Sequence, residues 1–170
     1  AYTGGPFPLA YNALGDVFVL IFFGFVAVCG TVYVQILTVP ELAWWAGALV
    51  GVLSTAILVV NNVRDVETDR QVGKRTLPVL LGRRAGQVEY AILLGLAYLI
   101  PAVIFHRGLA SFWVLACVLT FPIGRRLVHT VARQRDGEVL NRALAGTAML
   151  LLLHGALFSA GLVVSELMRR

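Results

Sequence analysis

The chain has 170 residues, of which 59% are hydrophobic and only 14% are charged. A water-soluble domain carries charge on about a quarter of its residues, so this composition excludes an ordinary soluble domain and indicates a single membrane domain over residues 1–170. The formal net charge of +5 does not indicate a nucleic-acid partner, because the chain has no stacking pattern and no basic face on a water-soluble helix. Basic loops at a membrane surface explain this charge more simply.

Residues 1–15 are rich in Gly and Pro and are not expected to form a regular helix. Asp16 is expected to cap the helix that follows. Five apolar runs then predict an all-α fold, a multi-span transmembrane helical bundle. The runs cover residues 17–37, 42–60, 90–105, 110–123 and 143–164. The fourth run is short for a span, so we expect it to extend into flanking residues or to be shielded by its neighbours.

The basic residues predict the orientation of these spans. If the spans alternate, only Arg107, Arg169 and Arg170 lie on one side. The other side receives Arg64, Arg70, Lys74, Arg75, Arg83, Arg84, Arg125, Arg126, Arg133, Arg135 and Arg142. Because positive residues are retained inside, the polar loop over residues 61–86 is expected on the cytoplasmic side of the membrane.

This loop carries the residues with the clearest chemistry. Asp65 and Asp69 are four positions apart, so a helical extension of the second span would place both carboxylates on one face. Their mutual repulsion is relieved by a hard divalent cation, and Mg²⁺ is commonly held by one or two carboxylates together with substrate phosphates. Lys74 and Arg75 would bind the remaining phosphate charge, and Gly73 would let the backbone turn.

Two aspartates four residues apart are weak evidence alone, because charged loop residues are usually just solvated. The concentration of carboxylates, amides and cations at a membrane boundary favours a functional site. His154, inside the fifth run, has two interpretations: a functional intramembrane group, or a neutral imidazole hydrogen-bonded to a neighbouring helix, which we favour. Cys29 and Cys117 are expected to be buried small side chains and not a disulfide.

At this point the motifs become specific. Residues 61–69 (NNVRDVETD), followed by 73–77 (GKRTL) and then Leu81-Gly82, resemble the second aspartate motif of the UbiA-type intramembrane prenyltransferases. Residues 2–11 and 14–16 are similar to the segment before that family's fifth span, and residues 140–142 to the start of its last span. Within the family, the chain most resembles the branch that prenylates 1,4-dihydroxy-2-naphthoate in menaquinone biosynthesis.

Family members have nine spans and two aspartate motifs, the first of N-D-x-x-D type. This chain lacks the first motif, and its five spans correspond to the family's last five. The resemblance therefore implies the C-terminal portion of a larger prenyltransferase. Its N-terminal half would be a partner of this chain, which we expect to be inactive alone.

The resemblance implies a Mg²⁺-dependent transfer of a polyprenyl group from polyprenyl diphosphate to dihydroxynaphthoate, with decarboxylation. Asp65 and Asp69 would be the catalytic, metal-binding residues, and residues 76–84 would cap the cytoplasmic mouth. The implied diphosphate-binding residues are Asn61, Asn62, Arg64, Lys74 and Arg75. Candidates for contact with the aromatic acceptor are Tyr11, Asn12 and Asp16.

Two other functions are weighed beside this one. A non-catalytic structural or lipid- and quinone-binding membrane subunit would keep the fold and would not need the first motif, although a scaffold has no use for two facing aspartates. A transporter ranks last, because transporter ion sites usually lie near the bilayer midplane and these aspartates lie at a membrane edge.

Overall fold

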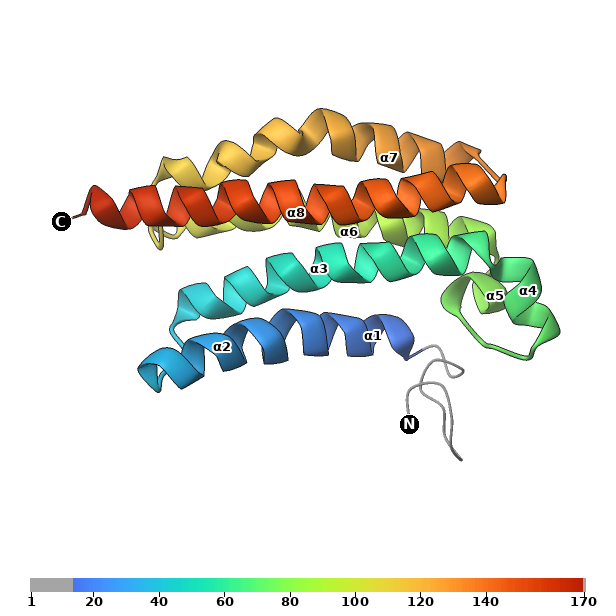
Figure 1. Cartoon of the computed structure of the whole chain (residues 1–170), viewed down its shortest axis with the longest axis horizontal. Coiled ribbons are helices and arrows are strands. Elements are labelled where there is room, and N and C mark those ends of the chain that lie inside the picture. The colour runs from blue at the N-terminus through green and yellow to red at the C-terminus, as the bar shows by residue number, and fades with distance from the viewer. Residues whose placement is uncertain (1–13, 170) are drawn as a thin grey trace.

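The computed structural model describes residues 14–169, which form one bundle of long helices lying side by side along a common direction (Figure 1). Its elements are α1 (Gly15–Val19), η2 (Leu20–Val26), α2 (Ala27–Ile36), α3 (Glu41–Arg64), α4 (Val66–Gln71), α5 (Leu77–Leu81), α6 (Arg83–His106), η3 (Phe112–Thr120), α7 (Phe121–Arg133) and α8 (Gly137–Leu167). Every element of the described part is helical: η2 is a π-helical segment within the first long helix, and η3 is a 3₁₀ segment.

Within residues 14–169, five helices are long and apolar enough to cross a membrane, which confirms the predicted all-α, five-span architecture. Their bounds are Gly15–Ile36, Glu41–Arg64, Arg83–His106, Phe112–Arg133 and Gly137–Leu167. Most of them extend beyond the apolar runs, because polar residues at the ends continue the helix. The fourth span extends in this way: its second half, α7, buries Gly124 and Val131 while its arginines remain exposed.

The first span packs mainly on α3 and is the least buried of the five. Its contact with α3 rests on small residues, which allow two helix backbones to approach closely. A Cβ atom built on Gly24 of η2 would lie 2.6 Å from the carbonyl oxygen of Gly47 and 2.8 Å from the Cα of Gly51. These three glycines therefore allow backbone-to-backbone contact between the first two spans.

The expected helix cap at Asp16 is wrong. Leu14 occupies the N-cap position, and no side chain there caps the helix. Asp16 lies inside the first turn of α1, and its carboxylate accepts a hydrogen bond of 3.2 Å from Nδ2 of Asn62 on α3. Because the helix begins two residues earlier than expected, the carboxylate is directed at the neighbouring helix and not at its own backbone.

The other four spans surround a core in which a few polar side chains form hydrogen bonds between helices. Tyr90 and Thr147 share a hydrogen bond of 2.9 Å between α6 and α8. His154, fully buried on α8, meets the hydroxyl of Thr120 on η3 at 2.9 Å from its Nδ1. The interpretation of His154 as a side chain hydrogen-bonded to a neighbouring helix is therefore confirmed. Both cysteines are buried and unpaired, as expected.

One end of the bundle collects the polar connections. The start of α1, the end of α3, the short helices α4 and α5 and the start of α6 lie together there (Figure 1). At the opposite end, the Glu41 carboxylate pairs with Arg107 and accepts a hydrogen bond from the Trp45 indole. The candidate site is therefore confined to one end of the bundle.

The close contact at Gly24 gives a first prediction. Gly24→Ala should destabilise the protein by about 1–3 kcal/mol, because the new methyl group meets rigid backbone on α3. Gly30→Ala is the matched control in the same span: nothing lies within 4 Å of its Cβ position, and alanine favours a helix more than glycine does. Thermal unfolding of both variants in detergent tests this, and equal melting temperatures would contradict the packing.

Candidate functional site

The site begins where the second span ends. Helix α3 stops at Arg64, Asp65 adopts a non-helical conformation (φ −95°, ψ 12°), and α4 continues directly. Backbone hydrogen bonds from Asp65 to Asn61 (3.0 Å) and from Asp69 to Asp65 (2.8 Å) carry the i to i+4 pattern across this break. Asp65 and Asp69 are therefore still one helical turn apart at the end of the span.

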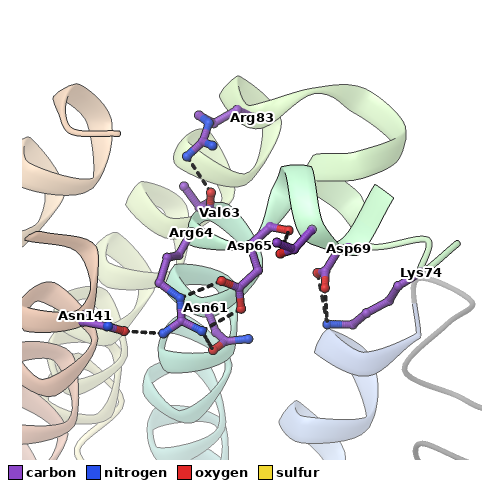
Figure 2. A network of polar contacts seen from close by, with 9 residues as sticks. Asn61, Val63, Arg64, Asp65, Asp69, Lys74, Arg83 and Asn141 are labelled. Atoms are coloured by element: carbon purple, nitrogen blue, oxygen red, sulfur yellow. Dashed lines mark hydrogen bonds and ion pairs between the residues drawn. The ribbon is translucent and has the colours of Figure 1, made fainter. Parts of the chain in front are cut away.

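The Asp65 carboxylate is held by its neighbour in the chain. The guanidinium of Arg64 donates from Nε at 2.7 Å to Oδ1 and from Nη2 at 2.6 Å to Oδ2, a two-pronged contact. The same guanidinium donates at 2.8 Å to the Asn61 side-chain oxygen and, through Nη1, to that of Asn141 on α8. One arginine thus joins the end of α3, the Asp65 carboxylate and the last span (Figure 2).

The Asp69 carboxylate has a different partner. Lys74 donates to its two oxygens at 3.0 and 3.3 Å, and the side chains are only 11% (Asp69) and 19% (Lys74) exposed. Gly73, with φ of +71°, allows the chain to double back so that Lys74 reaches Asp69. The predicted turn at Gly73 is therefore confirmed, and Lys74 contacts a carboxylate of the motif itself.

Arg64, Asp65, Asp69 and Lys74 form a charged corner at the end of α3. Figure 2 shows the two carboxylates of this corner turned to different sides, Asp65 toward Arg64 and Asp69 toward Lys74. Each is therefore neutralised by its own cation. The metal ion expected between the two carboxylates is not tested by this arrangement and stays a prediction.

Asn61 and Asn62 are adjacent in sequence and face different partners. Asn61 accepts from Arg64, whereas Asn62 is buried and donates to Asp16 of α1. The structure thus brings together Asn62, expected at the diphosphate, and Asp16, expected at the acceptor. Tyr11 and Asn12, the other two acceptor candidates, lie outside the described residues.

Three further polar residues, Arg75, Arg83 and Asn141, lie at this end of the bundle. Arg75 is exposed, and its side chain has no hydrogen bond or ion pair within residues 14–169. Arg83, at the start of α6, donates at 2.6 Å to the Val63 carbonyl and so ties the third span to the end of the second. The sequence placed Arg83 only within the expected cap of residues 76–84 and gave Asn141 no role at the site, because the contacts of both depend on which helices are neighbours. The one sequence signal they share is a polar residue at the same end of a span.

An apolar groove of about 410 Å³ lies beside this corner. It is open along the first span, α3 and α8, and it is lined by Val19, Phe23, Ser54, Ile57, Leu58, Asn61, Leu144 and Leu151. Asn61 belongs both to the groove and to the hydrogen-bond network of Arg64. The groove is therefore continuous with the polar corner, an arrangement that suits a ligand with a charged head and an apolar tail.

The donor atoms at the corner suit a hard cation. The carboxylates of Asp65 and Asp69 and the amide oxygen of Asn61 are oxygen ligands of the kind that Mg²⁺ prefers. No group of three His, Cys, Asp or Glu residues that could enclose a metal occurs in the described part of the chain. A magnesium ion here would need water and phosphate oxygens to complete its shell, which is its usual mode of binding.

The fold and this corner define a multi-span helical membrane protein with a charged site at one end of its bundle. The family model of the UbiA prenyltransferase family matches residues 1–153, and the chain belongs to that family. It is 36% identical to the 1,4-dihydroxy-2-naphthoate octaprenyltransferases of Haemophilus influenzae and Escherichia coli, over 96% and 97% of this chain and 53% and 54% of theirs. It is 38% identical to the UbiA prenyltransferase domain-containing protein 1 of Gallus gallus, over 96% of this chain and 47% of that protein. The chain thus spans about half the length of the curated relatives it matches. No solved structure matches it.

The two ion pairs of α4 give a second prediction. In a double-mutant cycle, Lys74→Ala and Asp69→Asn should show a coupling of about 1–3 kcal/mol in unfolding free energy, because removing the lysine alone leaves a mostly buried carboxylate unpaired. The exposed pair of Glu67 and Arg70 on the same helix is the control, with an expected coupling below about 0.5 kcal/mol. Equal couplings would show that Lys74 does not neutralise Asp69 in solution.

Proposed function

We propose that this chain is part of an intramembrane prenyltransferase that transfers a polyprenyl group from polyprenyl diphosphate to 1,4-dihydroxy-2-naphthoate, with loss of carbon dioxide. The observation that carries the proposal is the carboxylate and cation corner formed by Asp65, Asp69, Arg64 and Lys74 beside an apolar groove. Family membership and the names of the relatives support the reaction class and the two substrates. The activity belongs to the longer protein, of which this chain would supply one wall of the site.

The chemical task is to break an allylic C–O bond, so that negative charge grows on the departing diphosphate and positive charge on the prenyl carbon. A Mg²⁺ ion held by Asp65 and Asp69 would stabilise the charge on the leaving group. Arg64 and Lys74 are the donors already present at this corner. From its present position, each could release a carboxylate oxygen and bind a phosphate oxygen instead. Arg75, exposed and without a partner in the described part, would add a further positive charge.

The apolar groove has a separate role in this proposal. Its walls would hold the first isoprene units next to Asn61 and keep water away from the allylic cation, which water would otherwise capture. The aromatic carbon of the acceptor then attacks the cation. We propose that the acceptor approaches from the α1 side, where Asp16 is positioned by Asn62, with Tyr11 and Asn12 as additional candidate contacts.

We also propose that this end of the bundle faces the cytoplasm. Eleven of the fourteen basic residues belong to this side if the spans alternate, and such a bias sets the orientation of membrane proteins.

Substitutions at the two aspartates test the proposed reaction. In the full-length protein, Asp65→Asn or Asp69→Asn should lower the rate of prenyl transfer about 100-fold or more, because a ligand of the charge-stabilising ion is lost. Glu67→Gln is the control, since this exposed carboxylate lies on the same helix and pairs with Arg70. Membrane insertion should be unchanged in all three variants. A wild-type rate in Asp65→Asn would remove the basis of the proposal.

Magnesium and diphosphate binding are tested together. A non-hydrolysable analogue of a prenyl diphosphate should bind the full-length protein in the presence of Mg²⁺, and excess EDTA should abolish both this binding and turnover. Calorimetry measures the binding, and product formation measures the turnover. Turnover that is unchanged in EDTA would rule out a metal-bridged diphosphate. A membrane scaffold without chemistry would instead show no magnesium-dependent binding of the analogue.

A further inference from the structure

Helix α7 presents a basic face that the proposed reaction does not use. The rotation of this helix is fixed by contacts on its opposite side. Gly124 lies so close to Tyr98 of α6 that a Cβ there would be 2.6 Å from the phenolic oxygen, and Gln87 of α6 donates to the Val131 carbonyl at 3.0 Å. Since one side of α7 is held against α6 at both ends, the residues of the other side are directed away from the bundle.

A hollow of about 530 Å³ lies on this outward side. It is lined by Pro122, Arg125, Arg126, His129 and Thr130, all from α7. The Thr130 hydroxyl donates at 3.0 Å to the Arg126 carbonyl of its own helix, so the lining offers a ligand mainly the donors of two guanidinium groups and an imidazole. We call this feature the α7 basic hollow.

The cations of the α7 basic hollow differ from the three cations that make contacts around the end of α3. Arg64 and Lys74 contact carboxylates, and Arg83 contacts a backbone carbonyl. By contrast, the side chains of Arg125 and Arg126 are exposed and have no hydrogen bond or ion pair with any described residue. Two adjacent guanidinium groups without an acidic partner repel each other, and an anion between them relieves that repulsion.

The position of the hollow along the span identifies what kind of anion it meets. Arg125 lies eight residues before Arg133, the last residue of the span, which corresponds to about 12 Å along a helix. The polar headgroup layer on one side of a bilayer is only about 5–8 Å thick. If Arg133 lies at the outer edge of that layer, the Cα of Arg125 lies about 4–7 Å beyond its inner boundary. The long side chain of Arg125 can then extend outward to the lipid phosphates, which are the anions at hand.

The surface on the bilayer side of the hollow is apolar. Leu119 and Phe121 are 76% and 51% exposed, and Val118 and Ile123 are also exposed. Along a single span, the surface thus changes from exposed hydrophobic side chains to paired arginines. A phospholipid has the matching arrangement, with apolar acyl chains on the bilayer side and an anionic phosphate at the membrane surface.

We propose that the α7 basic hollow binds an anionic phospholipid. The phosphate would lie between Arg125 and Arg126, with the acyl chains along the exposed residues of η3 and the start of α7. Basic pockets at the cytoplasmic side of membrane helices are a recognised form of lipid headgroup site. The site is separate from the aspartate corner, so its occupancy does not depend on the proposed prenyl transfer.

A competition between two lipids tests this proposal. The full-length protein in detergent is mixed with equal amounts of phosphatidylglycerol and phosphatidylcholine, and native mass spectrometry counts each retained lipid. The wild type should retain phosphatidylglycerol preferentially. Arg125→Gln with Arg126→Gln should weaken this retention about 25-fold, at about fivefold for each arginine, without lowering the melting temperature. Arg133→Gln with Arg135→Gln, which removes the same charge outside the hollow, should leave retention within about twofold of wild type.

Three results would overturn the proposal. Equal retention of the two lipids by the wild type would show that no anionic lipid is selected. Equal loss in both double variants would show attraction by overall charge and not by the hollow. Displacement of phosphatidylglycerol by an equal concentration of glycerol 3-phosphate would show a site for a soluble phosphate. A salt titration of the wild type, which needs no variant, should weaken retention as ionic strength rises, and retention independent of salt would also count against the site.

Discussion

The contacts of the Arg64 guanidinium hold the polar end of this protein together. This one group neutralises the Asp65 carboxylate, and it donates hydrogen bonds to the side-chain oxygens of Asn61, one turn earlier, and of Asn141, at the start of the last span. Backbone hydrogen bonds already carry the helical pattern from Asn61 through Asp69. The arginine adds the side-chain contacts that hold the end of α3 and the Asp65 carboxylate against the last span.

The bilayer supplies the second constraint. Inside a membrane span, polar groups need partners from neighbouring helices, and the bundle provides them at Tyr90 with Thr147 and at His154 with Thr120. The charged chemistry is then confined to the ends of the spans. At the end formed by α3, α4 and α6, carboxylates and cations neutralise one another in close pairs, and an apolar groove begins beside them. This division between an apolar bundle and a charged end suits the binding of a lipid that carries a diphosphate.

The two carboxylates of the motif show how local spacing and tertiary contacts differ in what they specify. Their separation of four residues correctly indicated that they lie one turn apart, since the helical hydrogen bonds continue from Asn61 through Asp69. Their partners could not be derived in the same way. Lys74 pairs with Asp69 because Gly73 reverses the chain, whereas Arg64 pairs with its neighbour Asp65 and at the same time donates to Asn61 and Asn141.

The sequence by itself determined the membrane environment, the five helices and the segment that carries the charged residues. Long apolar runs can satisfy their backbone in a bilayer only as helices, and the largest group of charged residues lies between the second and third apolar runs. Only the tertiary structure decided which polar residues meet: Asn62 with Asp16, Arg83 with the Val63 carbonyl, and Asn141 with Arg64. It also decided that Arg125 and Arg126 face away from the bundle. These contacts depend on the rotation and neighbours of each helix, which the packing of residues such as Gly24 and Gly124 sets and which the periodicity of a nearly uniform apolar sequence does not reveal.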